Sequence, residues 1–228
     1  MLDLLVTERE GALAEATRLR HQLHQLLLLQ LDPEDRTHVP SLTTEAGLLA
    51  VERSQAGGSR ALDQTRAAAV RRTAQRLRLA LSQAEELAKQ IAAQAQAHFR
   101  TLTDLKGVGL LTAGALAGIL GPGRRFATEA QLAAYAGVAP LAASSAALVR
   151  HRLNRGGNRR LNAILHRIAL SQVRSWPPAQ AYLARRLAQG KTRREAIRAL
   201  KRFVVRARWR PWQACSPVSP TSYLPAAA

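Results

Sequence analysis

The stretch from residue 61 to residue 99 contains neither glycine nor proline, and this feature most constrains what the chain can fold into. Apolar residues recur in it every seven positions, in two interleaved registers. The pattern predicts one continuous helix with a coiled-coil seam, a stripe of packing residues rich in small side chains. The registers are Val70, Leu77, Ala84 and Ile91, and Ala74, Leu81, Ala88 and Ala95.

A second helix is predicted over residues 2–31, where leucines fall at helical spacing up to the break at Asp32-Pro33. The seam could pair with this helix as an antiparallel hairpin within the chain, or with another chain. Several glycines and prolines between the two helices predict a loop over residues 32–60, with at most one short helix around residues 44–53.

Positive charge is concentrated in one block of the sequence. The net charge is +19, and the segment from Arg150 to Arg210 holds eighteen lysines and arginines against one acid, Glu195. Such density requires a polyanionic partner or counterions. Nucleic acid is the first candidate and an anionic membrane surface the second. We find no amphipathic helix with bulky apolar anchors beside the charge, which favours nucleic acid.

Several protein classes are excluded by composition. Hydrophobic residues make up 47% of the chain, too many for a disordered polyelectrolyte, and only 4% are aromatic, which favours helix over sheet. The single cysteine, Cys215, excludes an intramolecular disulfide and a cysteine-type zinc site. No apolar run reaches the roughly 18 residues of a membrane span. The start has no signal-peptide pattern, so we expect a cytoplasmic protein without a membrane partner.

A helix-hairpin-helix is predicted over residues 102–120, where "KGVG" separates two apolar segments. Gly107 and Gly109 would let the backbone turn tightly and approach a partner closely. The free N–H groups at the start of the second helix could then bind a phosphate. Both glycines are therefore candidate DNA-binding residues. The alternative is an ordinary helical turn with a glycine cap.

Local signals divide the remaining chain into short helices, so the predicted fold class is all-α: a long helical coiled-coil arm followed by a small helical domain. We expect an arm over residues 1–100, a domain over 101–210 and a disordered tail over 211–228. The signals are a capping box at Thr128–Gln131 with Gly137 closing its helix, an N-cap at Asn158 for a helix to Ser175, Pro177-Pro178 opening a helix that ends at Gly190, and a capping box at Thr192–Glu195.

The stretch "APLAASSAALVRHRLNRGGNRRLN", residues 139–162, places two serines just before five arginines. A serine hydroxyl can attack a phosphodiester if its proton can leave and the phosphoryl charge is stabilised. Arginine suits the second task because its planar fork grips two phosphate oxygens. His151 is a general-base candidate from spacing alone. The alternative to a catalytic role is a structural one, in which the serines cap or form a turn and Gly156-Gly157 forms a turn with positive φ. The residues concerned are Ser144, Ser145, Arg150, Arg152, Arg155, Arg159 and Arg160.

Five motifs follow one another in a recognisable order over about residues 101–208. They are "L-x-x-L-x-G-V-G-x-x-T-A", "Q-L-A-A-Y-A-G-V-A-P", "S-S", "R-H-R-L-N-R-G-G-N-R-x-L-N" and "R-R-L-A-x-G-K-T-x-R-E". Together they resemble the C-terminal half of the insertion-sequence one-ten family of transposases, also called the one-sixteen and nine-oh-two type.

The resemblance implies an enzyme that moves an insertion sequence. Its members join an N-terminal RuvC-like domain, with four acids and divalent metal, to a C-terminal domain that supplies a serine nucleophile. Some use a structured guide RNA, and their assembly is oligomeric, with the two sites coming from different subunits. The nucleophile maps to Ser145, preceded by Ser144. The family has glycine next, where this chain has Ala146.

We find no RuvC-like pattern before residue 101. We therefore expect a truncated transposase that binds DNA and needs a partner for the metal-dependent half. No cofactor is expected in this chain, and Mg²⁺ only in the RuvC-like domain. The expected partners are DNA, a guide RNA, and a second copy or a full-length homologue through the coiled coil. Two alternatives remain: a non-catalytic helix-hairpin-helix protein that binds nucleic acid, and the remnant of a decayed element.

Overall fold

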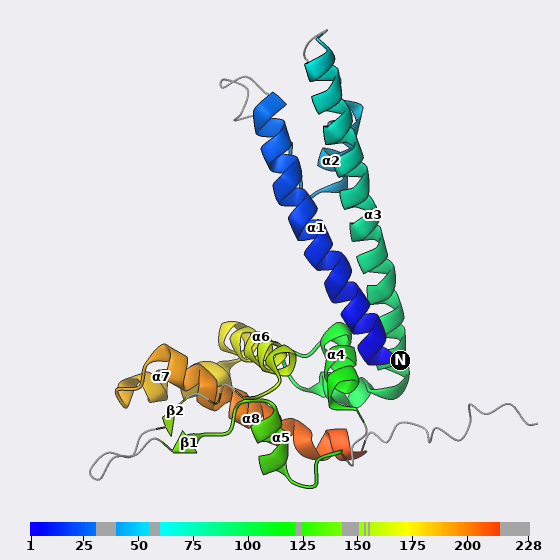
Figure 1. Cartoon of the computed structure of the whole chain (residues 1–228). Helices are drawn as coiled ribbons and strands as arrows, with labels where there is room; N and C mark the ends of the chain where they lie inside the picture. Colours follow the sequence, from blue (N-terminus) through cyan, green and yellow to red (C-terminus); the bar gives the residue numbers. More distant parts are fainter. Residues whose placement is uncertain are drawn as a thin grey trace, which may run out of the picture. The chain divides into compact units, whose positions relative to one another are not determined.

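The computed structural model describes residues 1–30, 40–54, 60–121, 125–142, 151–152, 154 and 156–214. These residues are mainly helical and form two compact units (Figure 1). Residues 4–90 make up the arm, and residues 1–3 together with 91 onward make up the C-terminal unit. The elements are α1 (Leu2–Gln30), α2 (Glu45–Arg53), α3 (Ala61–His98), η2 (Arg100–Asp104), α4 (Leu110–Leu120), α5 (Glu129–Tyr135), β1 (Leu141–Ala142), β2 (His151–Arg152), α6 (Arg159–Ser175), α7 (Pro177–Ala188) and α8 (Arg193–Ala214).

The arm is built on the predicted seam, and α1 of the same chain covers it. Val70 and Leu77 on α3 are almost fully buried and share a core cluster with Leu19 and Leu23 on α1. Of the two partners that the pattern allowed, the intrachain hairpin is therefore present. The cluster consists of Ala16, Leu19, Leu23, Leu27, Leu42, Leu48, Val51, Val70, Ala74, Leu77 and Ala80.

The short helix α2 completes the arm's core, as predicted for the region around residues 44–53. Thr44 caps it by accepting a hydrogen bond from the Gly47 N–H at 3.2 Å. Arg78 on α3 then donates to both carboxylate oxygens of Glu52, at 3.1 and 3.0 Å. Both bonds come from the Nη1 of Arg78, so one charged nitrogen bridges the two carboxylate oxygens and ties α2 to α3.

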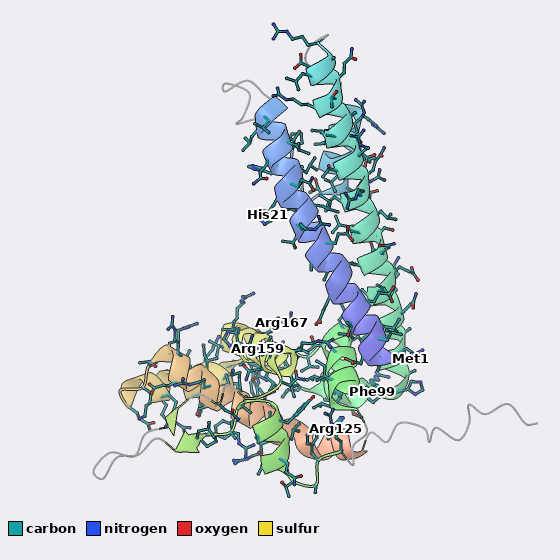
Figure 2. The ribbon with its side chains drawn as sticks, viewed as in Figure 1. Met1, His21, Phe99, Arg125, Arg159 and Arg167 are labelled. Carbon is teal, nitrogen blue, oxygen red and sulfur yellow. The ribbon has the colours of Figure 1, made fainter. Side chains whose placement is uncertain are left out.

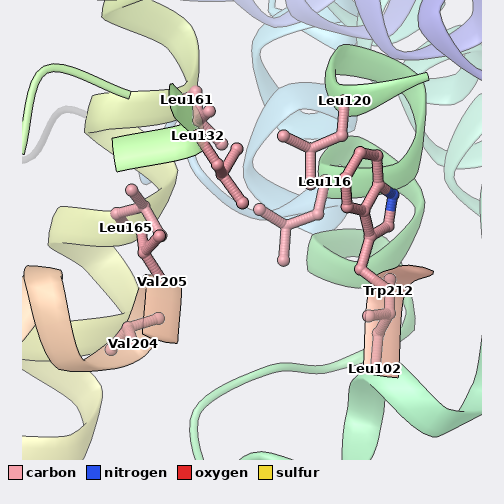
Figure 3. Close-up of a pocket in the computed structure, with 9 residues that line it drawn as sticks. All are labelled: Leu102, Leu116, Leu120, Leu132, Leu161, Leu165, Val204, Val205 and Trp212. Atoms are coloured by element: carbon pink, nitrogen blue, oxygen red, sulfur yellow. The ribbon is translucent and has the colours of Figure 1, made fainter. Parts of the chain in front are cut away.

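The core of the C-terminal unit lies around α6, which packs against α4, α7 and α8. Its buried residues recur at helical spacing, so one face of α6 is apolar and the other is free for solvent. A narrow apolar cavity of about 20 Å³ remains, room for about one water molecule (Figure 3). Its lining is Leu102, Leu116, Leu120, Leu132, Leu161, Leu165, Val204, Val205 and Trp212.

The predicted helix boundaries are confirmed where a local cap sets them. Thr128 and Gln131 form a reciprocal capping box at the start of α5. Asn158 caps α6 by accepting from the Leu161 N–H at 2.9 Å. At α8 the Glu195 N–H donates to the Thr192 hydroxyl, while a Glu195 oxygen accepts from the Thr192 N–H. Each cap satisfies N–H groups that the first helical turn leaves without partners.

The predicted all-α fold class is confirmed for the described residues. One detail differs, because the two-residue strands β1 and β2 pair antiparallel between α5 and α6. The first helix of the predicted hairpin motif is also different, since η2 is a 3-10 turn of five residues.

The expected start of the tail at residue 211 is likewise wrong. Helix α8 continues to Ala214, and Trp212 is 1% exposed. Proline inside a helix costs about 3 kcal/mol. Burying the Trp212 indole, an area of about 200 Å², contributes about 5 kcal/mol of stability. This gain exceeds the cost of the proline and explains why the helix persists past Pro211. Residues 215–228 lie outside the described residues.

Within the described ranges, no helix is both long and apolar enough to span a bilayer.

Candidate nucleic-acid interface

In the sequence, the two predicted catalytic serines fall after β1 and before β2. Ser144, Ser145 and Arg150 fall in residues 143–150, and Arg155 stands alone at its position; all four lie outside the described residues. The flanks of the segment are described: Ala142 pairs with His151, and Leu141 pairs with Arg152. The pairing brings the two ends of the serine segment side by side, and it places the backbone of His151 and Arg152 at its exit.

A close backbone contact lies directly after β2. A Cβ at Gly157 would come within 2.2 Å of the Gly137 nitrogen and 2.3 Å of the Gly137 Cα. Only glycine fits at Gly157, so the second glycine of the Gly-Gly turn is explained by close approach. Its predicted positive φ is wrong at Gly157; the positive φ belongs to Gly137, at +66°. The motif "RGGN" is therefore packed onto the turn that ends α5.

Asparagines extend this contact into a polar network. Asn158 donates from its side chain to the Tyr135 hydroxyl at 3.0 Å, and its backbone N–H donates to the Tyr135 carbonyl at 2.7 Å. Asn162, one turn along α6, donates to the Ala136 carbonyl at 2.8 Å. These bonds hold the start of α6 against the end of α5.

Lys201 on α8 joins this polar network through Asn162. Its ammonium donates to the Asn162 Oδ1 at 2.8 Å, although the residue is only 6% exposed. Burial, with Arg198 adding repulsion, lowers the pKa of Lys201 below its usual value. Burial, with Lys201 adding repulsion, also lowers the pKa of His166. Among the described residues, no carboxylate forms an ion pair with Lys201.

The Gly107–Gly109 turn differs from the prediction in the use of its two glycines. Gly107 has φ +88°, and a Cβ there would meet the Ile168 carbonyl at 3.2 Å and the Ser171 Cβ at 3.3 Å. It therefore serves packing against α6. Gly109 is exposed, precedes α4 and has open space around it. Of the pair, only Gly109 faces solvent where a phosphate could approach.

The arginines of the C-terminal unit differ in whether an acid pairs with them. Arg159, in the first turn of α6, is exposed (Figure 2). Arg160 beside it forms an ion pair with Asp3 at 3.1 Å and so has a structural role. The side chain of Arg152 is not described. On α8, Arg202 and Arg206 both pair with Glu129.

Acidic side chains do little to neutralise this surface. No aspartate or glutamate occurs between Glu129 and Glu195, a span that holds twelve lysines and arginines. Glu195 itself forms the capping box of α8, where it accepts hydrogen bonds from the Thr192 N–H and hydroxyl. These two bonds lower the pKa of Glu195. The unit therefore presents a cationic face suited to a polyanion.

A metal site finds no support in this part of the chain. Within the described ranges, no three histidine, cysteine, aspartate or glutamate side chains are grouped so that they could hold a metal ion.

Sequence reasoning missed Asn162, Lys201 and Gln172. Gln172 is 1% exposed and donates to the Lys106 carbonyl at 2.9 Å, tying α6 to the glycine turn. Each of the three contacts joins residues at least 25 positions apart, so no local pattern signals it. The only hint was that Asn162 lies in the same quoted motif as Asn158.

Comparison with known proteins agrees with the motif order. The sequence model described as "Transposase IS116/IS110/IS902 family" matches residues 99–184. A protein of Streptomyces coelicolor, "Insertion element IS110 uncharacterized 43.6 kDa protein", is 37% identical over 123 residues. That similarity covers 53% of this chain and 30% of the relative, so this chain spans less than a third of the relative's length.

Proposed function

We propose that this chain binds DNA and supplies the serine nucleophile for transposition of an insertion element. The premise is that the chain belongs to the IS116/IS110/IS902 family of transposases, whose sequence model matches residues 99–184. The matched region includes both serines and the arginines that follow them. That single observation carries the proposal.

In the proposed step, the Ser145 hydroxyl attacks a phosphorus atom of one DNA strand. A bond forms between Oγ and phosphorus, and one phosphorus–oxygen bond of the strand breaks. The serine gives up its proton to a base, and the released sugar oxygen takes up a proton to become a hydroxyl. The phosphate stays on the protein as a phosphoserine ester, whose charge Arg150, Arg152, Arg155 and Arg159 would stabilise.

The described residues support this proposal through what surrounds the serine segment. Strands β1 and β2 hold its two ends together, and the Gly157–Gly137 contact holds the base of the β2 side. A nucleophile needs such fixed support, because misplacement by about 1 Å can cost a hundredfold in rate. The cationic surface nearby supplies a binding site for the strand being cut.

The test is a covalent adduct between the protein and element-end DNA, measured with and without a full-length homologue. We expect an adduct that is lost in Ser145→Ala and kept in the neighbouring control Ser144→Ala. An adduct that survives Ser145→Ala would refute the assignment. Supplying the homologue tests whether the chain needs the acidic, metal-dependent half from a partner.

A second candidate is a nucleic-acid-binding protein without catalysis. Ala146, where the family has glycine, favours it, because a turn that needs positive φ would be strained by alanine by about 1 kcal/mol or more. The two candidates differ in sequence preference: a transposase binds its element ends more tightly than random duplex, whereas this alternative binds both alike. Restoring glycine with Ala146→Gly should raise adduct yield only if the first candidate is correct.

A further inference from the structure

The outer face of α6 continues beyond the first turn as a row of exposed cations. Arg159, Arg167 and Arg174 are all exposed, and spacings of eight and seven residues place them on one side of the helix. Ala163, between the first two, is exposed and small, so it leaves the row open. Figure 2 labels Arg159 and Arg167 on this helix.

These arginines differ from their neighbours in having no ion pair among the described residues. Arg160 pairs with Asp3, while Arg202 and Arg206 pair with Glu129. Three of the unit's four acids are thus used by other arginines or by the α8 cap: Asp3, Glu129 and Glu195. A long row of uncompensated guanidinium groups on a rigid helix repels itself and is stabilised by an anion of matching length.

We propose that Arg167 and Arg174, continuing from Arg159, form a track that binds the phosphate backbone of duplex DNA. This proposal rests on the proposed function and extends its DNA site to residues to which neither the motifs nor the comparisons assign a role.

The length of the row agrees with duplex DNA. Fifteen residues separate Arg159 from Arg174, which corresponds to about 22 Å along a helix that rises 1.5 Å per residue. A duplex rises about 3.4 Å per base pair, so the row spans about six base pairs. Three contacts over that distance position a strand without reading its bases, because phosphate contacts carry no sequence information.

The glycine turn packs on α6 beside the positions of Arg167 and Arg174. Gly107 packs on Ser171, which lies four residues after Arg167 and three before Arg174 on adjoining positions of the helix surface. Exposed Lys106 of that turn is attached to α6 by the bond from Gln172.

The experiment compares two double variants. The track variant combines Arg167→Gln and Arg174→Gln, and the matched control on α3 combines Arg71→Gln and Arg72→Gln. Both remove two positive charges from helix surfaces, and circular dichroism checks that both stay folded. Affinity is measured across a salt series for a random-sequence duplex about three helical turns long. A single-stranded RNA of equal length is measured in parallel.

We expect the track variant to bind the duplex about tenfold more weakly or worse, with the salt dependence of log K reduced by about 2. The α3 variant should keep the slope of the unmodified protein. Equal slopes in both variants would overturn the track, as would a loss confined to the RNA. The duplex affinity is measured without scoring cleavage, and the adduct is measured separately, so failure of the track and failure of the nucleophile assignment are distinguishable.

Discussion

The arm and the C-terminal unit are both helical, yet they differ in what their charges do. The arm holds twelve basic and eleven acidic residues, whereas the C-terminal unit holds twenty-two basic and four acidic ones. In the arm, acids and bases meet at contacts such as Arg78–Glu52 and Arg76–Glu15. In the C-terminal unit most cations have no acid to meet. Similar secondary structure therefore serves a self-contained support in one unit and an anion-binding surface in the other.

Their cores differ as well. The arm buries a repeating stripe of leucine, valine and alanine, and its one buried polar side chain among the described residues is Thr73. The C-terminal unit buries Gln172 and Lys201, each hydrogen-bonded across the fold. A buried polar network fixes geometry strongly but tolerates little change, because a lost partner leaves a desolvated group. We expect the two units to respond differently to substitution.

The largest expected effect is on the arm. Leu77→Ala should cost about 3 kcal/mol of unfolding free energy, because it removes a fully buried side chain from the seam. Hydrogen exchange on the whole chain should show the loss in residues 4–90. Leu79→Ala, at a position that is 60% exposed, is the control and should change little. An equal loss of protection in the C-terminal unit would mean that the two units unfold as one.

A somewhat smaller effect is expected at the backbone contact of the C-terminal unit. Gly157→Ala should destabilise that unit by about 2 kcal/mol, because its Cβ would collide with Gly137 backbone atoms. Gly156→Ala is the control, since its Cβ would meet only the Asn154 Oδ1, at 3.5 Å. Thermal unfolding and adduct yield are both measured. If the two variants behave alike, the close contact does not support the serine segment.

The next effect has the opposite sign. Gly11 lies inside α1, and a Cβ there would meet nothing within 4 Å. Gly11→Ala should therefore stabilise the arm by about 0.8 kcal/mol through helix propensity alone. In the C-terminal unit, Gly114→Ala should destabilise, because its Cβ would lie 2.5 Å from the Ile91 Cγ2. Chemical denaturation of both variants checks the contrast, and a stabilised Gly114→Ala would contradict it.

The smallest expected effect concerns pH. The pKa of His166 is lowered from 6.5, so the unfolded chain binds more protons than the folded chain between the two values. The contribution of the neutral His166 to the unfolding free energy is fully present above pH 6.5, and it is lost as the pH falls through the lowered pKa of the folded state. His166→Gln should flatten this loss in urea titrations between pH 7 and about pH 5. A variant with the same pH profile as the unmodified protein would show that the imidazole contributes nothing.

Much of the fold could be predicted because its signals are local. The heptad stripe of α3 and the caps at Thr128, Asn158 and Thr192 each depend on residues within a turn or two. The predictions failed where distant residues decide. The indole of Trp212 holds α8 together past Pro211, and its neighbour Phe126 lies 86 positions earlier, with ring centroids 5.9 Å apart.

The candidate site divides in the same way. The exposed position of Arg159 follows from its place in the first turn of a capped helix, and the motif order identifies the family. That Arg160 is engaged by Asp3, 157 positions earlier, could not be predicted, because no pattern links the two residues. The same holds for Gly107, whose closest contacts are on α6.

The sequence by itself determined where most helices begin and end, which helix of the arm bears the seam, and where positive charge gathers, since these depend on neighbouring residues and composition. Only the tertiary structure decided which cations are neutralised, which glycine is packed and which is open, and how Lys201 and Asn162 join α8, α6 and the end of α5. The physical reason is that ion pairing, close packing and buried hydrogen bonds need a partner, and the chain brings that partner from far away.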